Sequence, residues 1–350
     1  MSRLRPLSIL NPPTTVPVGI QRHPRPVERE VHATRATVCL AHGLFGFDTL
    51  GPPPFQVHYW RGIREALIDL GCHVLVARVP AAASIRDRAH HLHYFLRRAL
   101  SPNADLVILA HSMGGLDARY LVSRIRPQSL IERSKGMEGY RVRAIVSVCT
   151  PHRGSPFMDW CRDNIGLGAD GNGQRAADIA SEIRDSSTTS NIAHLQNTEQ
   201  VLPGDLTRIS PYLTSTLHRL SSLVPLLRTL DQPAYKNLTT TYLKDRFNPN
   251  TPNFANVIYH SYAARARRMS PLHPLRVPWE IVAEKEGEND GLVSVESAKW
   301  GKFMGLYEAD HWEMNKGVTL PVQLGGRLGE PLDVTAMYVE AVSQLYNLGC

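Results

Sequence analysis

Short apolar runs alternate with amphipathic stretches over the first half of the chain. The apolar runs are typical of buried strands, and the stretches between them repeat their apolar residues at helical spacing. The predicted strands cover residues 37–41, 72–80, 105–110 and 140–151, and the predicted helices cover 58–71, 84–100 and 114–122. Strands that alternate with helices form right-handed βαβ units. The pattern therefore predicts an α/β fold with a mostly parallel sheet and helices on both faces.

This alternation stops after Ser155 and resumes near Trp279. The stretch between them holds a glycine-rich segment at 166–174, typical of a hinge, and the apolar segment "LTSTLHRLSSLVPLLRTL" (213–230). The leucines of 213–230 predict an amphipathic helix that either packs on the core or covers a site. We also predict a strand followed by an acidic loop over 279–293, and a closing helix over 332–348.

These patterns divide the chain into four parts. We expect a flexible, basic, proline-rich arm at 1–35, a first part of the α/β core at 36–155, a cap or lid insertion at 156–250 and a second part of the core at 251–350. The arm holds six arginines and no acid before Glu28, a composition typical of a transit peptide. Its six prolines disfavour the helix that such a peptide needs, and they favour an extended arm.

Composition limits the classes of partner. The 350 residues carry a formal net charge of +7, but the basic residues are dispersed and do not alternate with aromatic ones, so we expect no nucleic-acid binding. A basic surface also attracts anionic lipid headgroups. No run approaches the ~18 apolar residues of a membrane span, and the first residues lack the apolar stretch of a signal peptide. The five cysteines show no CxxC spacing and favour free thiols in a reducing compartment.

The stretch "VILAHSMGGLDARYLV" (107–122) passes from a strand to a helix around Ser112. A turn this sharp is typical of the nucleophile elbow, in which a strained backbone presents a serine hydroxyl at the top of the sheet. Ala110 replaces the first glycine of the G-x-S-x-G pattern. A Gly-Gly turn with an incidental serine is the alternative. We predict that Ser112 is a nucleophile.

A serine nucleophile requires a base and an orienting carboxylate, because a neutral hydroxyl attacks poorly. In α/β-hydrolases the carboxylate and then the histidine follow the serine along the chain. Asp290 in "EKEGENDG" and His311 in "EADHWEMN" occupy these places. Taken singly, Asp290 equally fits an Asx-turn and His311 a loop histidine. Together with Ser112 they predict a Ser-His-Asp triad.

An oxyanion hole requires backbone N–H groups that converge on the reacting carbonyl. Met113 follows the predicted nucleophile and supplies the first candidate. Leu44 lies in "AHGLFG", the glycine loop after the first predicted strand, and supplies the second. A plain turn is the alternative for this loop.

Six segments occur together and in order: "CLAHGLFGFDTLGP", "AHSMGGLDARYLV", "TPHRGSP", "LTTTYLKDRFN", "ENDGLVSVESAKWG" and "DHWEMN". They resemble the triacylglycerol lipases of Pseudomonas and Burkholderia type and the related mitochondrial lipases of fungi. The matching segments are spread over residues 38–315. The resemblance implies an α/β-hydrolase fold, the triad Ser112, Asp290 and His311, oxyanion-hole positions at Leu44 and Met113, and a mobile lid after "TPHRGS".

The chain departs from the secreted bacterial members of that family at two places. Glu296 stands where one cysteine of their disulfide falls. Glu313 stands where one of two calcium-binding aspartates falls, and no carboxylate occurs between Asp245 and Glu280, where the other belongs. We therefore expect no metal and no cofactor, and an intracellular protein of the mitochondrion or cytoplasm.

The resemblance and the triad predict a serine ester hydrolase of lipids, with triacylglycerols as its substrate. Its partners would be the lipid ester and, by peripheral contact, a lipid droplet or membrane surface. A phospholipase or acyltransferase of the same fold is an alternative, because the fold does not choose among these reactions. A catalytically inactive lipid-binding scaffold is an alternative of another class, and an intact triad argues against it.

Overall fold

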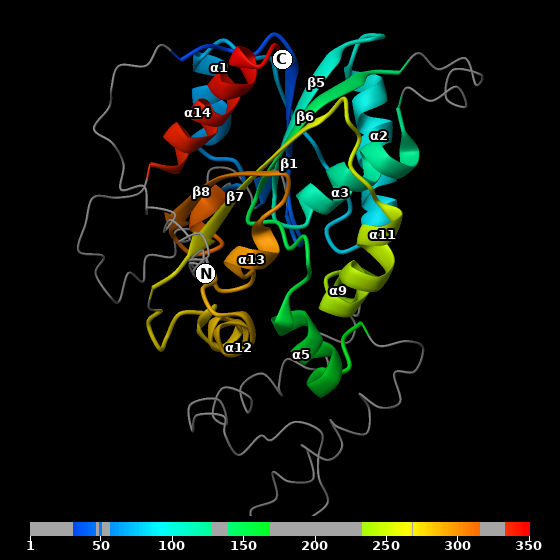
Figure 1. The fold of residues 1–350 in the computed structure, drawn as a ribbon. Coiled ribbons are helices and arrows are strands. Elements are labelled where there is room, and N and C mark those ends of the chain that lie inside the picture. Colours follow the sequence, from blue (N-terminus) through cyan, green and yellow to red (C-terminus); the bar gives the residue numbers. More distant parts are fainter. Residues whose placement is uncertain are drawn as a thin grey trace, which may run out of the picture.

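A six-stranded parallel sheet runs through the computed structural model, which describes residues 31–46, 49–50, 57–127, 139–168, 233–267, 269–315 and 333–350. The strand order is β4–β1–β5–β6–β7–β8 (Figure 1), and every pairing in it is parallel. The strands are β1 (Thr37–Ala41), β4 (Val74–Val76), β5 (Asp105–His111), β6 (Arg141–Val148), β7 (Ile258–Arg265) and β8 (Lys302–Glu308). A short antiparallel pair, β2 (Thr49–Leu50) with β3 (Val57–His58), lies outside the sheet. The predicted α/β class is confirmed.

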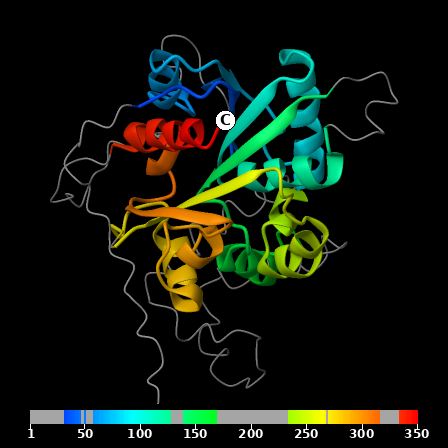
Figure 2. The ribbon, with the colours of Figure 1, turned by 45° about the horizontal axis from the view of Figure 1, so that its top comes forward.

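Helices cover both faces of the sheet. Figure 1 shows α1 (Ile63–Asp69) and α14 (Val334–Asn347) on one face, and α2 (Ile85–Ala99) and α3 (Gly114–Tyr120) on the other. The view of Figure 2 separates the same two layers. Each face has its own apolar cluster, and β1, β5 and β6 contribute alternate residues to both. Strands buried on both faces read as continuous apolar runs, which explains why the sequence pattern located them.

The strand predicted at the start of 279–293, before the acidic loop, is wrong. Residues Arg276–Glu286 form the helix α12, whose buried residues Pro278, Ile281 and Val282 have helical spacing. The strand that pairs with β6 and β8 is instead β7, which the hydrophobic pattern did not predict. After α12 the chain comes back beside the end of β7, where Ala266 N donates a hydrogen bond to Asn289 O (2.8 Å).

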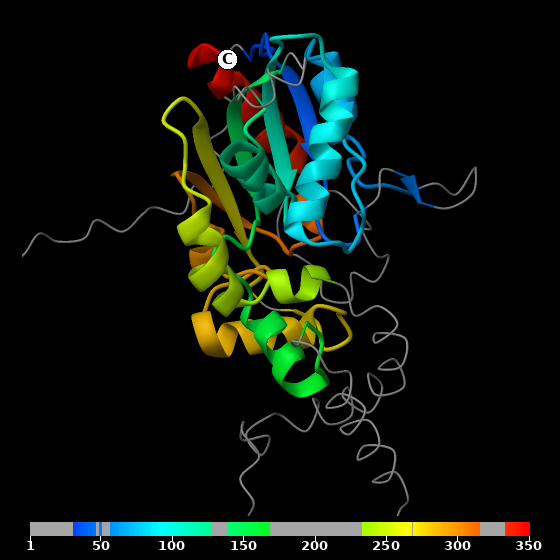
Figure 3. The same ribbon diagram turned by 90° about the vertical axis from the view of Figure 1, so that its right-hand side faces the viewer.

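The two described ends of the predicted insertion lie side by side. The first end is α5 (Pro156–Ile165). The second comprises α9 (Pro233–Asn237), α10 (Thr240–Tyr242), the π-helical turn η3 (Leu243–Phe247) and α11 (Asn248–Asn250). Figure 3 shows them together below the sheet. The Asp159 carboxylate accepts hydrogen bonds from Thr240 N (3.1 Å) and Thr240 Oγ1 (2.6 Å). Gly168 lies so close that an added Cβ would be 2.5 Å from Lys236 N. The predicted helix at 213–230 and most of the predicted hinge lie outside the described residues.

Several other predictions concern single features. All five cysteines are free and buried. No helix among the described residues is long and apolar enough to cross a membrane.

Residues 1–30 of the predicted arm lie outside the described residues. Its last residues contact the core, since His32 N donates to Ser343 Oγ of α14 (3.2 Å) and Arg35 N donates to Cys350 O (3.3 Å).

Candidate active site

Ser112 occupies a sharp turn between β5 and α3. Its φ is 56°, a left-handed conformation that non-glycine residues rarely adopt, so the backbone is strained at this position. Two hydrogen bonds hold the turn, from Ser112 N to Val148 O (2.9 Å) and from Thr150 Oγ1 to Ser112 O (2.7 Å). Gly114 must be small, because an added Cβ would lie 2.5 Å from Ala41 O. This geometry is that of a nucleophile elbow.

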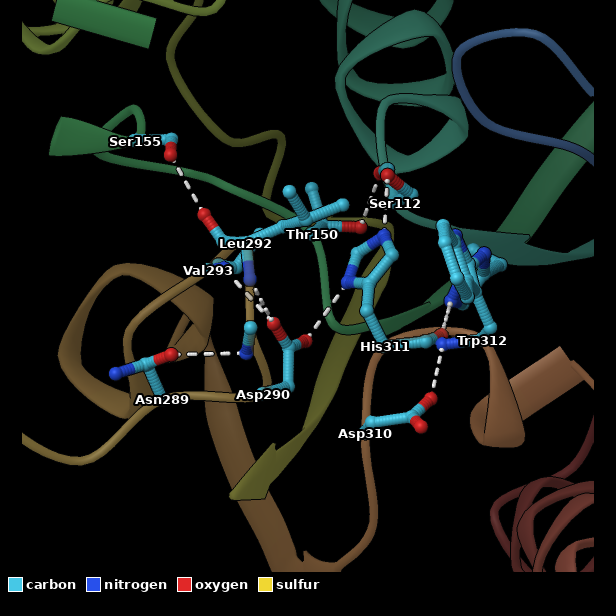
Figure 4. A network of polar contacts seen from close by, with 12 residues as sticks. Ser112, Thr150, Ser155, Asn289, Asp290, Leu292, Val293, Asp310, His311 and Trp312 are labelled. Atoms are coloured by element: carbon cyan, nitrogen blue, oxygen red, sulfur yellow. Dashed lines mark hydrogen bonds and ion pairs between the residues drawn. The ribbon is translucent and has the colours of Figure 1, made fainter. Parts of the chain in front are cut away.

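The structure brings the three predicted triad residues into direct contact (Figure 4). Ser112 Oγ lies 2.9 Å from His311 Nε2, and His311 Nδ1 lies 2.8 Å from Asp290 Oδ2. Because the carboxylate accepts, His311 carries its proton on Nδ1 and offers the Nε2 lone pair to the serine hydroxyl. His311 and Asp290 are buried, whereas Ser112 is partly accessible. The arrangement can therefore deprotonate a serine hydroxyl that a substrate can reach.

Backbone groups hold Asp290 in place. Its Oδ1 accepts hydrogen bonds from Leu292 N (2.9 Å) and Val293 N (2.8 Å), which leaves Oδ2 for the histidine. His311 N donates to Asp290 O (2.8 Å), so the two loops are also joined by their main chains. The Asx-turn that the sequence also allowed for Asp290 is thus present together with the hydrogen bond to His311. One carboxylate can take part in both, because its two oxygens have four lone pairs.

The two predicted oxyanion-hole residues flank Ser112. Met113 directly precedes α3, and Leu44 lies in the loop after β1. That loop touches the elbow, because a Cβ on Gly43 would be 2.5 Å from Ser112 Cβ. Within the part of the chain that the structure describes, neither Leu44 N–H nor Met113 N–H has a protein acceptor.

Cys149 is a neighbour of the triad that the sequence did not identify. Ligand atoms of Cys149, Asp290 and His311 all lie within 4.8 Å of one another, a grouping that can also hold a metal ion. The pKa of the Cys149 thiol is raised well above its ordinary value, first by burial and then by Asp290, so the thiol is a poor nucleophile. His311 and Asp290 are hydrogen-bonded to each other, which favours their use in a triad.

Among the described residues near His311, the carboxylates are engaged by protein groups and do not form a calcium site of two carboxylates. The Glu313 carboxylate accepts a hydrogen bond from Asp310 N (2.8 Å). The Asp310 carboxylate pairs with His273 Nε2 (3.3 Å). His273 lies between Asp245 and Glu280, the stretch that contains no carboxylate. Calcium prefers six to eight oxygen ligands, and a histidine is a poor substitute.

The fold is that of α/β-hydrolases, and a serine, a histidine and an aspartate lie in series at the candidate site. The sequence of the chain is similar to those of curated triacylglycerol lipases, as the motifs suggested. Identity is 27% over 270 residues to triacylglycerol lipase 2 of Saccharomyces cerevisiae, covering 74% of this chain and 62% of the relative. It is 30% over 192 residues to the triacylglycerol lipase of Burkholderia plantarii, covering 53% of this chain and 48% of the relative. The chain thus spans roughly half to three fifths of the length of these curated relatives.

Solved structures agree on the fold. The lipase of Staphylococcus hyicus superposes with a TM-score of 0.58 at 16% identity, covering 92% of this chain and 98% of that one. A metagenomic carboxyl esterase gives a TM-score of 0.57 at 19% identity, covering 95% of this chain and 82% of that one. No protein-family model matches the chain.

Proposed function

We propose that this protein is a carboxylic ester hydrolase that uses Ser112 as its nucleophile and triacylglycerols as its substrate. The observation that carries the proposal is the series of hydrogen bonds from Asp290 through His311 to Ser112, with Ser112 in a strained turn. The substrate class rests on the similarity to curated triacylglycerol lipases.

The proposed reaction follows from the hydrogen bonds. Ser112 Oγ attacks the acyl carbonyl carbon while its proton moves to His311 Nε2, and Asp290 stabilises the resulting imidazolium. The N–H groups of Leu44 and Met113 receive the negative charge on the carbonyl oxygen. His311 then protonates the leaving glycerol oxygen, and the acyl group remains on Ser112. Water, deprotonated by His311, attacks the acyl-enzyme, and His311 returns that proton to Ser112 Oγ as the fatty acid leaves.

We assign residues 156–250 to a cap over this site, between the core parts at 36–155 and 251–350. The two described ends of the insertion support the assignment, because they border the loop that carries Leu44. The Phe45 ring, next to Leu44, lies 6.0 Å from the Tyr235 ring. The insertion also contacts the start of α2, where Ile85 N donates to Asn237 Oδ1 (2.8 Å). Met113 and Leu44 belong to one apolar cluster with Met158, Leu167 and Leu238 from the insertion ends. A cap at this position would meet a lipid droplet or membrane surface when it opens.

We propose an intracellular location, in the mitochondrion or the cytoplasm. The arginine-rich, acid-poor residues 1–35 and the five free cysteines support it. Fractionation of cells that express the full chain tests this assignment, and recovery from the medium would contradict it.

Product analysis tests the proposed reaction. Emulsions that contain both triacylglycerol and phospholipid are incubated with the wild type and with Ser112→Ala, and all lipid products are identified. We expect free fatty acid and diacylglycerol from the wild type alone. Lysophospholipid as the main product would indicate a phospholipase, and acyl transfer to an alcohol an acyltransferase. Lipid binding without any product would indicate an inactive scaffold.

A further inference from the structure

The hydroxyl of the buried Tyr59 lies between His111 and the loop that carries Leu44, called here the oxyanion loop (42–46). His111 directly precedes Ser112. Tyr59 precedes α1, and its side chain reaches across to the site from the face that α1 covers. Its hydroxyl is 2.6 Å from His111 Nδ1, and Gly43 N donates to the same oxygen (3.2 Å). Gly43 directly precedes Leu44. Tyr59 is 8% exposed and His111 is 1% exposed, so water does not compete for these bonds.

The direction of each hydrogen bond follows from the chemistry of the partners. His111 Nε2 lies 3.0 Å from His311 O, and a backbone carbonyl only accepts, so His111 carries its proton on Nε2. Its Nδ1 is then a lone pair, which requires Tyr59 to donate. Burial raises the pKa of Tyr59 to about 12, and burial together with His311 holds the pKa of His111 well below its ordinary value. Tyr59 thus remains a donor and His111 remains neutral around neutral pH.

These hydrogen bonds link two loops and the end of a strand. Gly43 belongs to the oxyanion loop, His111 is the last residue of β5 and directly precedes Ser112, and His311 belongs to the loop after β8. Asn315, at the end of the loop after β8, also forms a hydrogen bond with the Tyr59 hydroxyl. We propose that Tyr59 is a positioning residue, which orients the Leu44 N–H toward the substrate oxyanion through Gly43 and orients the His311 loop through His111. The inference rests on the proposed serine mechanism.

A neutral His111 also matters during the reaction. The rings of His111 and His311 have centroids 4.7 Å apart. When His311 takes the serine proton it becomes positively charged, and a second positive charge at this distance would oppose that step. The Tyr59 hydrogen bond stabilises the neutral tautomer of His111, because it engages the nitrogen that would otherwise accept a second proton.

The first test removes one oxygen atom. Tyr59→Phe deletes the donor to His111 and the acceptor for Gly43, and Tyr140→Phe is the matched control. Tyr140 is also buried, and its hydroxyl contacts His93 Nδ1 (3.0 Å) at a site away from the triad. We expect kcat on a soluble short-chain ester to fall between about tenfold and a hundredfold in Tyr59→Phe with KM unchanged, as for other misplaced catalytic groups. Tyr140→Phe should keep the wild-type kcat at a similar loss of melting temperature.

A second readout isolates the oxyanion hole. Sulfur accepts hydrogen bonds more weakly than oxygen, so a thionoester gains less from the Leu44 and Met113 donors than the matching oxoester. Tyr59→Phe should therefore lower the rate ratio of oxoester to thionoester. His111→Asn keeps an acceptor for Tyr59 but loses the donor to His311 O, so it should slow both esters equally. This second variant tests the network even if Tyr59→Phe does not fold.

Equal kcat losses in Tyr59→Phe and Tyr140→Phe, or an unchanged rate ratio in folded Tyr59→Phe, would overturn the proposal. If Tyr59→Phe does not fold, the test rests on His111→Asn. A lowered rate ratio of oxoester to thionoester in that variant would overturn the proposal. Hydrolysis that persists in Ser112→Ala would instead overturn the proposed function, so the two failures are distinguishable.

Discussion

Arg88 Nη2 lies 2.8 Å from Asp117 Oδ2, in an ion pair whose side chains are 0% and 2% exposed. The pair joins α2 to α3, the helix that follows Ser112. The same guanidinium donates to His42 O (2.7 Å) and Pro80 O (2.8 Å), and so ties that helix to the loop that carries Leu44. A single buried cation thus connects the two halves of the proposed oxyanion hole.

Arg88→Met should lower the free energy of unfolding by about 3–5 kcal/mol, because it leaves the Asp117 carboxylate buried without its partner. Chemical denaturation of the wild type and the variant measures the difference. Arg141→Met is the matched control, since Arg141 pairs with Asp105 at the surface, where the side chains are 48% and 32% exposed. The control should lose about 1 kcal/mol or less. Similar losses in both variants would show that burial of the Arg88 pair is unimportant.

Ser112→Ala should abolish ester hydrolysis and covalent labelling by a fluorophosphonate probe, because no other group takes the place of the nucleophile. The expected loss in turnover is on the order of 10⁶-fold, by analogy with another serine hydrolase. Ser101→Ala, at an exposed serine, should retain full labelling. Labelling of Ser112→Ala at the wild-type rate would contradict the assignment of the nucleophile.

Stability should fall as the pH drops below neutrality, because two buried histidines resist protonation in the folded protein. Burial and the charge of His311 hold the pKa of His111 well below its ordinary value, and burial, Arg119 and Arg153 do the same for His152. In the unfolded chain both titrate near ~6.5. Below that pH the unfolded state binds more protons than the folded state, so the free energy of unfolding decreases with falling pH.

Each such histidine adds a slope of up to about 1.4 kcal/mol per pH unit. His152→Gln should therefore flatten the dependence of unfolding free energy on pH between about 5 and 6.5. His91→Gln, at an exposed histidine, should leave the slope unchanged. A slope that is the same in wild type and His152→Gln would mean that His152 takes up a proton in the folded state.

Chelation should leave both hydrolysis and melting temperature unchanged. Glu313 is engaged with Asp310 N, and the stretch between Asp245 and Glu280 contains no carboxylate to complete a calcium site. Thermal melts with EDTA, and with EDTA followed by calcium, measure the effect. A drop in melting temperature that calcium restores would reveal a site built from other oxygens.

Replacing Leu223, Leu226 and Leu227 with serine should slow hydrolysis of emulsified long-chain esters far more than that of soluble short-chain esters. The reason is the proposed cap, whose apolar face would contact lipid when it opens. The matched control replaces Leu272 and Leu348, which are 71% and 54% exposed in the core parts, with serine. Equal losses on both esters in a folded variant would place residues 213–230 in ordinary core.

Local patterns in the sequence were sufficient for the strands β1, β4, β5 and β6 and the helices between them, and for Ser112 as the predicted nucleophile. The strands β1, β5 and β6 lie in the middle of a parallel sheet, where burial on both faces requires a continuous apolar run. The change from strand to helix around Ser112 is equally local, because it takes place within a few residues. Asp290 and His311 followed from chain order and from the resemblance to lipases.

Only the tertiary structure decided what depends on contacts between distant segments. The sequence pattern predicted a strand at the start of 279–293 because several apolar residues stand close together there. The burial of Pro278, Ile281 and Val282 on one face of α12 is visible only in the folded chain. The Tyr59 hydroxyl meets His111 from 52 residues away, and His111 meets His311 O from 200 residues away. Propensity and periodicity describe neighbours along the chain, so they carry no information on which loops converge at the end of a sheet.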